Sequence, residues 1–441
     1  RPPSISRPMR SKSIVAAERD SFFAGSGGRV LRHNFFANMM DGALYAFGLS
    51  FASQQTVLPV FVQKIGGGNV AIGLIPILWM LSFNLPQILI ASHAQRQRHK
   101  KRLLLKTAMG QRLPWLLLAV LAFFILPRVT PLAGLMLFFI IYASAGIGGS
   151  INLPVWFDIF AKMTPISLRG RLFAARMILG GVLGIGAGIA VRHILAWLPY
   201  PGNFGLIFLL TFAAMLVSYF FLTILKEPRS ARSRTAAPLL REYLGALPSI
   251  IREERNYRNF LIADGALYLA WMANGFFTVH ALSRFDLPAS AAGTFTAIMM
   301  ASNIAGNLFF GWLADHFGQR INLILSAGMM TLSCALAIFA PGPELYCLVF
   351  VGSALAIALV QISRLPLIAE LCSAEQRPTF VALANLISSP FIIAGVAGGW
   401  LADRCGYEFL FACSGLFALF SMGWYASVVR EPRGTAHERV F

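Results

Sequence analysis

Four ionisable side chains stand inside long apolar stretches of this sequence: Asp41, Arg112, Asp264 and Arg364. A charged group within an apolar membrane helix is costly and usually serves a function. With a rise of about 1.5 Å per residue, all four are expected roughly 9 to 13 Å from the same membrane face. Two interpretations remain open. The four groups form a structural network of ion pairs, or one acid exchanges protons while one arginine holds an anionic group of a solute.

The elements that must position these groups are long apolar helices. Of the 441 residues, 57% are hydrophobic and 12% are charged, whereas soluble domains carry about 25% charged residues. Because about 20 apolar residues span a bilayer as a helix, the sequence predicts an all-α membrane protein with twelve transmembrane helices. The predicted spans are 35–62, 70–94, 103–126, 132–161, 172–198, 203–225, 258–283, 288–314, 321–340, 345–372, 379–402 and 408–429.

The basic residues are unevenly placed between the two sides of the membrane. The net charge of +19 comes from 37 Lys and Arg against 18 Asp and Glu. With the N-terminus inside, 30 of the 37 fall in cytoplasmic segments and five in external loops. This bias follows the positive-inside rule, so both termini are expected to be cytoplasmic. It also accounts for the charge without a nucleic-acid partner.

Three short segments recur in the same order in the two halves of the chain. The pentapeptide Asp-Gly-Ala-Leu-Tyr occurs twice, letter for letter, in the first and the seventh predicted span. The other two repeats fall in spans 4 and 10 and directly after spans 6 and 12. The two halves therefore read as parallel copies related by an axis along the membrane normal. The repeated segments are 41–45 with 264–268, 153–158 with 365–370, and 226–229 with 430–433.

The repeat helps to separate the roles of the two acids. Asp41 and Asp264 occupy equivalent positions, so only partners on neighbouring helices distinguish them. Arg112 has an apolar residue at its equivalent position, and Arg364 has Asn152. We therefore expect Arg112 to pair with Asp41. Arg364 then remains as the substrate contact and Asp264 as the main proton-coupling acid, with Asp41 as the second candidate.

A sequence motif at the end of the eighth span resembles a known family. It reads Gly311-Trp-Leu-Ala-Asp315-His-Phe-Gly318-Gln-Arg320, and this pattern resembles the loop signature of the major facilitator superfamily. The resemblance extends over essentially the whole chain, through its twelve predicted spans, its two halves of six and its long middle segment. It implies two pseudo-symmetric six-helix bundles that work by alternating access, with the named residues of this motif at the cytoplasmic gate.

Further gate residues follow from the same resemblance. The turn after the fourth span is similar to the family's R-G-R turn, and an arginine stands at the corresponding place after the tenth span. Two acids precede these turns and are expected to pair with the arginines or with Arg320. These residues are Asp158, Glu370, Arg169, Arg171 and Arg377.

Amide side chains within the spans either hydrogen-bond across helices or contact a solute. The resemblance implies that spans 1, 4, 7 and 10 line a central cavity. We therefore predict that one amide from each of these spans joins Arg364 in binding the substrate. These amides are Gln54, Asn152, Asn274 and Gln361.

Three glycines at four-residue intervals lie on one face of the fifth span. They are Gly180, Gly184 and Gly188. Small residues let helices approach closely, so this face is expected to pack against neighbouring helices.

The sequence predicts a transporter and not an enzyme. It contains no nucleotide-binding motif, no zinc-protease motif and no serine-hydrolase motif, and no cofactor or metal is expected. We predict a monomeric secondary transporter of a small solute in the cell inner (plasma) membrane, in contact with lipids and driven by a proton or other ion gradient. Export of a drug or metabolite and import of a nutrient both remain open, as does a non-transporting membrane sensor or scaffold.

The predicted domain organisation follows the spans. A basic, disordered cytoplasmic tail precedes two bundles of six helices, which a cytoplasmic linker joins, and a second tail ends the chain. The boundaries are 1–34, 35–225, 226–257, 258–429 and 430–441.

The charge bias makes the orientation testable. Single cysteines placed next to Lys64, Arg128 or Arg284 are expected to react with an impermeant thiol reagent from outside the cell. Cysteines next to Arg98 or Arg234 are expected to react only after the membrane is opened. The reverse pattern in either set would contradict cytoplasmic termini.

Overall fold

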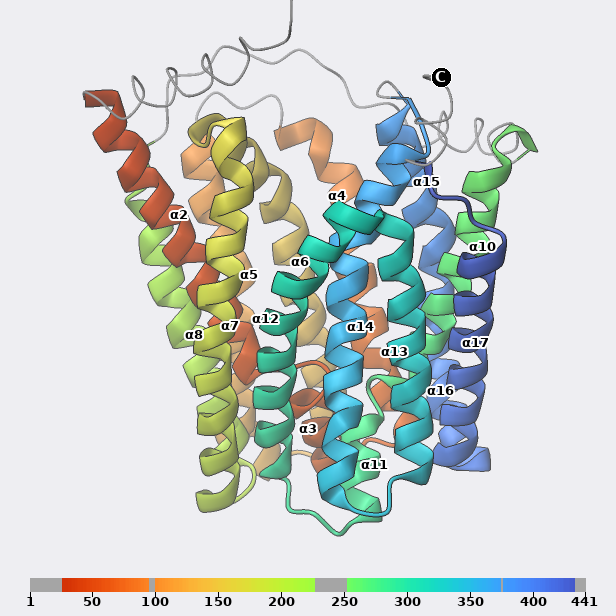
Figure 1. The fold of residues 1–441 in the computed structure, drawn as a ribbon. Helices are drawn as coiled ribbons and strands as arrows, with labels where there is room; N and C mark the ends of the chain where they lie inside the picture. The colour runs from red at the N-terminus through yellow and green to blue at the C-terminus, as the bar shows by residue number, and fades with distance from the viewer. Residues whose placement is uncertain (1–25, 95–99, 227–251, 374–375, 433–441) are drawn as a thin grey trace, which may run out of the picture.

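The apolar runs fold as long helices, as their composition predicts. The computed structural model describes residues 26–94, 100–226, 252–373 and 376–432. The first half contains α2 (Ser26–Phe51), α3 (Val57–Ile65), α4 (Asn69–Ala94), α5 (Lys100–Val120) with its continuations η1 (Leu121–Ile125) and η2 (Leu126–Arg128), α6 (Pro131–Met163), α7 (Ile166–Trp197) and α8 (Gly202–Thr223). The second half contains α10 (Arg255–Ala270), η3 (Trp271–Ala273), α11 (Phe277–Arg284), α12 (Ala291–Phe317), α13 (Gln319–Phe339), α14 (Pro343–Glu370), α15 (Arg377–Ser388), η4 (Ser389–Ile393), α16 (Ala394–Cys405) and α17 (Tyr407–Ser427). Figure 1 shows the long helices running side by side between the two ends of the bundle.

Nine segments of the described residues are long and apolar enough to cross a membrane. The three predicted spans outside this set correspond to α2 with α3, to α4, and to α15 with η4 and α16. In two of them the helix is interrupted, at 52–56 and at 389–393, and α4 contains Pro76 and Pro86. The chain is therefore a multi-pass all-α membrane protein, while the count of twelve spans stays a prediction.

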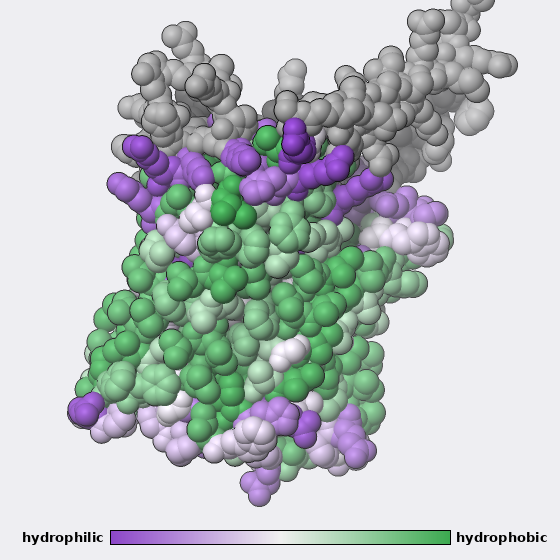
Figure 2. Space-filling model, turned by 90° about the vertical axis from the view of Figure 1, so that its left-hand side faces the viewer, coloured by the Kyte–Doolittle hydropathy of each residue, from purple (hydrophilic) through white to green (hydrophobic). Residues whose placement is uncertain are grey.

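The surface agrees with a membrane environment. Figure 2 shows a broad apolar band around the middle of one face, with hydrophilic residues at both ends of the bundle. Large apolar side chains such as Leu308, Leu416 and Phe420 are exposed. Exposed apolar surface of this extent marks contact with lipid or with a partner.

The first helix begins earlier than the sequence predicts. Residues 26–34 form the start of α2, so the prediction that they belong to a disordered tail is wrong. The Asn34 side chain donates to the Lys226 carbonyl at 3.0 Å and accepts from the Lys226 amide at 2.9 Å. This contact between distant parts of the chain fixes the first turns of α2. Residues 1–25 and 433–441 of the predicted tails and residues 227–251 of the predicted linker lie outside the described residues.

The same contact recurs in the second half, at the first residue of the third sequence repeat. Asn256 donates to the Arg430 carbonyl at 2.9 Å and accepts from the Arg430 amide at 2.8 Å. In each half the residue that opens the repeated (Lys/Arg)-Glu-Pro-Arg segment therefore ties the end of the last helix to the start of the first. The backbone of Lys226 and that of Arg430 therefore occupy equivalent positions in the two halves.

The two halves meet through glycines at the end of the bundle that contains α3 and α11 (Figure 1). Gly73 of α4 lies against the backbone of Gly395 on α16, so that a side chain at residue 73 would collide with it. Gly293 of α12 lies in the same way against Gly188 and Arg192 of α7. An offset of 220, which lies between the offsets of the first two repeats, aligns Gly73 with Gly293. These two crossings therefore have the pseudo-two-fold relation expected of parallel repeats.

Polar contacts accompany the glycine crossings. The hydroxyls of Thr56 and Thr296 lie 2.5 Å apart. The Thr278 hydroxyl donates to the Gln55 carbonyl at 2.9 Å. The Asn69 side chain hydrogen-bonds to Asp403 at 2.8 Å and to Tyr407 at 2.7 Å. In the orientation that the charge bias predicts, this end is external.

The predicted glycine face of the fifth span is confirmed. A Cβ at Gly180 would lie 2.9 Å from the Ala46 methyl of α2, and one at Gly184 would lie 3.0 Å from Met300 of α12. At Gly188 it would lie 2.5 Å from the backbone nitrogen of Ala297. Only the absence of side chains lets α7 approach both neighbours this closely.

Gly188→Val is expected to push α7 away from α12, because the new side chain meets backbone that has no room to yield. Spin labels at Lys64 and Glu344, which are exposed at this end, should then move apart, and the melting temperature should fall. Gly186→Val is the matched control, since a Cβ at Gly186 has no atom within 4 Å. Equal distances in the two variants would contradict a closure that depends on Gly188.

Candidate functional site

A buried ion-pair cluster surrounds Asp41 on α2. One carboxylate oxygen accepts a hydrogen bond from Ser218 at 2.8 Å and lies 3.4 Å from a terminal nitrogen of Arg112. Arg112 also donates to the Met215 carbonyl at 2.8 Å. Its side chain is 2% exposed, and that of Asp41 is 5% exposed. The predicted contact between Arg112 and Asp41 is therefore present, and it joins α2, α5 and α8.

A second arginine at this cluster was missed from the sequence. Arg176 of α7 lies 3.8 Å from the other oxygen of Asp41. It donates to the side-chain oxygen of Asn38 at 2.8 Å and stacks over the ring of Trp156 at 4.7 Å. Arg176 was counted among the basic residues of the cytoplasmic segments, although it falls inside the predicted span 172–198. Its position within an apolar span was the signal that could have identified it.

The second half holds a tighter and balanced pair. Arg364 of α14 donates to both oxygens of Asp264 on α10, at 2.9 to 3.1 Å. Ser388 of α15 donates to the same carboxylate at 2.8 Å, and Asn385 accepts from Arg364 at 3.0 Å. The side chains of the pair are 1% and 8% exposed. In this state the predicted substrate contact and the predicted proton site are thus bound to each other.

The repeated pentapeptide builds part of both clusters. Its tyrosine follows the aspartate by one helical turn, and each tyrosine ring lies beside the arginine paired with that aspartate. The guanidinium of Arg112 is 5.7 Å from the centre of the Tyr45 ring, and that of Arg364 is 5.4 Å from Tyr268. Cation–π contacts of this kind stabilise a desolvated charge. The identity of the two pentapeptides was the signal for these tyrosines.

A central cavity of about 390 Å³ lies between the two halves. Gln54 and Asn274, two of the predicted substrate contacts, line it. Asn274 also accepts a hydrogen bond from Ser353 at 3.0 Å. Most of the remaining lining is aromatic or apolar and was not predicted from the sequence. It includes Trp79, Met80, Phe83, Tyr268, Trp271, Met272 and Phe391.

A smaller pocket of about 160 Å³ adjoins the Asp41 cluster. Asn152, a further predicted substrate contact, lines it and hydrogen-bonds to Thr107 at 2.9 Å and to Gln111 at 3.3 Å. Phe83 lines both this pocket and the central cavity. The fourth predicted amide, Gln361, is exposed on α14 and lines neither of them.

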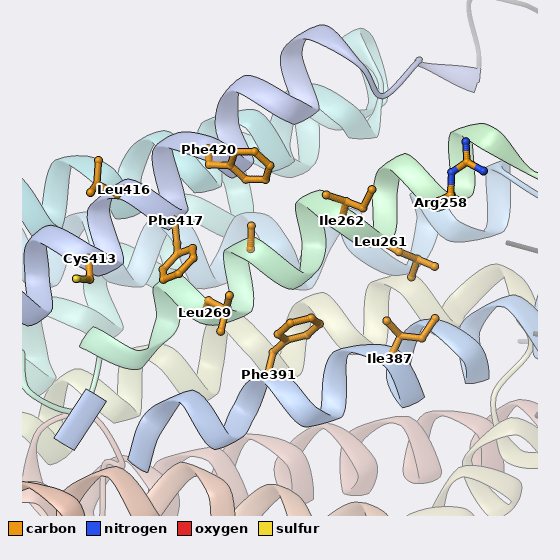
Figure 3. Close-up of a pocket in the computed structure, with 11 residues that line it drawn as sticks. Arg258, Leu261, Ile262, Leu269, Ile387, Phe391, Cys413, Leu416, Phe417 and Phe420 are labelled. Carbon is orange, nitrogen blue, oxygen red and sulfur yellow. The ribbon is translucent and has the colours of Figure 1, made fainter. Parts of the chain in front are cut away.

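The largest of the three cavities, about 810 Å³, lies away from these polar groups. Figure 3 shows it between α10, α17 and the segment around Phe391, with Arg258 at one end. Its lining is otherwise apolar apart from a cysteine, and several lining side chains, including Leu416 and Phe420, are exposed. Such a groove suits lipid chains and offers few groups that could orient a polar solute.

The predicted gate arginines bond mainly to helix ends. Arg169 donates to the Ala161 carbonyl at 2.6 Å, and Arg377 donates to the Ala369 carbonyl at 3.2 Å. Both contacts reach back eight residues and cap the preceding helix. Asp158 forms an ion pair with Lys162 at 2.6 Å. Arg171 is exposed near the start of α7.

The signature segment after α12 packs on the end of α17 and on Glu431. Gly318 has φ +88° and lies against the carboxylate of Glu431. The Arg320 amide donates to that carboxylate at 3.0 Å, and its side chain donates to the Tyr425 carbonyl at 2.8 Å. Asp315 is exposed, and Gly311 has open space around it. In this state the segment ties α12 and α13 to α17.

Comparisons with known proteins agree with this architecture. Residues 260–440 match the family model of the Major Facilitator Superfamily. A stretch of 131 residues is 29% identical to solute carrier family 22 member 6 of Oryctolagus cuniculus, and it covers 29% of this chain and 23% of that carrier.

Solved structures extend the likeness to both halves. A mutant of the nucleoside transporter NupG is similar with a TM-score of 0.70 and 13% identity, over 91% of this chain and 100% of that one. A D-xylose–proton symporter is similar with a TM-score of 0.68 and 14% identity, over 91% and 98%. At these identities the likeness concerns the fold. The model of the Major Facilitator Superfamily thus matches the second half of the chain, and the fold of these two transporters is shared by both halves.

Proposed function

We propose that the chain is a secondary active transporter that moves a small solute through the central cavity by alternating access. The observation that carries the proposal is a cavity between two pseudo-symmetric halves that meet through close crossings at one end of the bundle. Gly73 and Gly293 form these crossings. Gln54 and Asn274 supply hydrogen-bonding groups among aromatic side chains, which is the usual composition of a site for a small organic molecule.

The described state fits one half of a transport cycle. The halves are closed at the end of α3 and α11, which is external in the proposed orientation with cytoplasmic termini. Rocking of one half on the other would open the end at Thr56 and Thr296, and the cavity would then be exposed to the external side of the membrane. The protein is proposed to act as a monomer with twelve spans in the cell inner (plasma) membrane.

Proton coupling is proposed to act through Asp264. Its carboxylate binds Arg364 of α14 and Ser388 of α15, so it joins three helices. Protonation would remove the charge that holds Arg364, and a buried pair that loses one partner is destabilised by about 3–5 kcal/mol. α15 continues through η4 into α16, whose Gly395 forms one of the crossings. Protonation of Asp264 can therefore act on the closed end through α15, η4 and α16. It would also free Arg364 to contact the solute.

Alternating access makes a locked protein inactive. The Thr56 and Thr296 hydroxyls lie 2.5 Å apart, so the double variant Thr56→Cys/Thr296→Cys is expected to form a disulfide under oxidation. Uptake in liposomes should then stop and return after reduction, whereas each single variant should remain active under both conditions. The uptake assay is run with a panel of solutes, and it also shows in which direction the transported solute moves. Full activity of a completely cross-linked protein would contradict the mechanism.

Coupling is tested by comparing two modes of transport. Asp264→Asn is expected to abolish accumulation driven by a pH gradient but to retain counterflow, because exchange needs no net proton movement. Asp286→Asn is the matched control, since Asp286 is exposed and its φ of 50° suits asparagine equally well. Loss of both modes together with poor expression would instead favour a purely structural ion pair.

A further inference from the structure

The Asp41 cluster carries more positive than negative charge. The lining of the small pocket includes two guanidinium groups, those of Arg112 and Arg176, and Asp41 is the one acid among the described residues that line it. We propose that this pocket binds the carboxylate, or a similar monoanionic group, of an organic solute whose body occupies the central cavity. The proposal rests on the proposed transport function and names the substrate class for it.

The surplus charge belongs mainly to Arg176. Arg112 lies closer to Asp41 than Arg176 does, at 3.4 Å against 3.8 Å, and it also bonds to the Ser218 hydroxyl at 2.8 Å. The Arg112 side chain is 2% exposed, whereas that of Arg176 is 15% exposed. A charge inside a membrane bundle is stabilised by a partner, and Arg176 is the arginine that a ligand can reach.

The pocket matches one end of a larger solute. Its volume of about 160 Å³ suits a small charged group. Phe83 lines both the pocket and the 390 Å³ central cavity, so the two adjoin at this side chain, and the proposed solute would extend past it. Trp156 stacks on Arg176, and Asn152 and Gln111 add amide groups to the lining. A planar guanidinium with adjacent amides recognises a carboxylate well.

The second half provides an internal comparison. The offset of 212 that aligns the repeats of spans 4 and 10 places Ser388 at the position of Arg176. Ser388 is neutral and donates to Asp264 at 2.8 Å, and that acid is matched by the single arginine Arg364. The same fold therefore reaches charge balance in one half and leaves a positive excess in the other. Since the cluster geometry does not require the excess, it is available for an anion.

The backbone makes room for Arg176 at one position. The guanidinium lies directly against Gly42, so that any side chain there would occupy the same space. The equivalent Gly265 lies instead against the ring of Phe391, and a Cβ added at Gly265 would be 2.9 Å from that ring. Gly42 thus leaves room for the guanidinium of Arg176, and Gly265 leaves room for the ring of Phe391.

The test uses the purified full chain and two probes of the same shape. Benzoate is anionic and benzamide is neutral, and calorimetric titration measures the affinity of each. Wild type is expected to bind benzoate at least about tenfold more tightly than benzamide, as a charge-assisted hydrogen bond provides. Arg176→Gln should lose this preference. Arg192→Gln should keep it, because Arg192 is exposed at the other end of the same helix.

Two further variants keep the test decisive if Arg176→Gln fails to fold. Gly42→Ala retains every charge but displaces the guanidinium, so the preference for benzoate should fall. Arg176→Lys keeps the charge and should retain part of it. Absence of benzoate binding by wild type, equal affinity for both probes, or an unchanged preference in Arg176→Gln or Gly42→Ala would overturn the proposal.

Failure of the site and failure of transport give different results. Transport of a neutral solute that is unaffected by Arg176→Gln, with no preference for benzoate, overturns the anion site and leaves the transport function intact. Benzoate binding that depends on Arg176, without transport of any solute in the panel, supports the anion site and contradicts the transport function.

Discussion

The cost of burying charge inside an apolar bundle constrains the interior of each half. An aspartate on the first helix of the half is stabilised only if a cation from another helix reaches it. Asp41 receives Arg112 from α5 and Arg176 from α7, and Asp264 receives Arg364 from α14. Removal of a partner from such a pair leaves a buried, uncompensated charge. The ion pairs therefore hold the helices of each half in a fixed arrangement.

The contacts between the halves are of a different kind. Gly73 and Gly293 bring backbones together, and Thr56 and Thr296 form a hydrogen bond between neutral hydroxyls. Hydrogen bonds between membrane helices contribute only about 0.6 kcal/mol on average. Such an interface depends on close packing and hydrogen bonds, whereas ion pairs hold the helices within each half. Stiff halves joined in this way suit the proposed rocking mechanism.

Local patterns were readable from the sequence, whereas long-range contacts were not. Apolar runs predicted most of the helices, and the repeated pentapeptide pointed to equivalent acids, because both depend on neighbours along the chain. The early start of α2 depends on the contact between Asn34 and Lys226, and the position of Arg176 depends on space left by Gly42 of another helix. The interruption at 389–393 contains Pro390 after two serines, which is a helix-breaking signal that apolar periodicity alone does not register. The residues of the candidate site were therefore predicted for its two acids, for Arg112 and Arg364 and for three of its amides, but not for Arg176 or the aromatic lining.

The identical pentapeptides of the two halves have different surroundings. In the first half the motif faces two arginines and a pocket with excess positive charge, while in the second it faces a balanced pair and the ring of Phe391. Under the proposed mechanism an anion would therefore bind mainly to the first half, and a proton would bind to Asp264 in the second. A solute that extends from Arg176 into the central cavity also touches second-half residues such as Trp271. Binding would then alter the contact between the halves, while protonation alters the helix that carries Gly395. Because both events act on one interface, solute and proton can be coupled without direct contact between them.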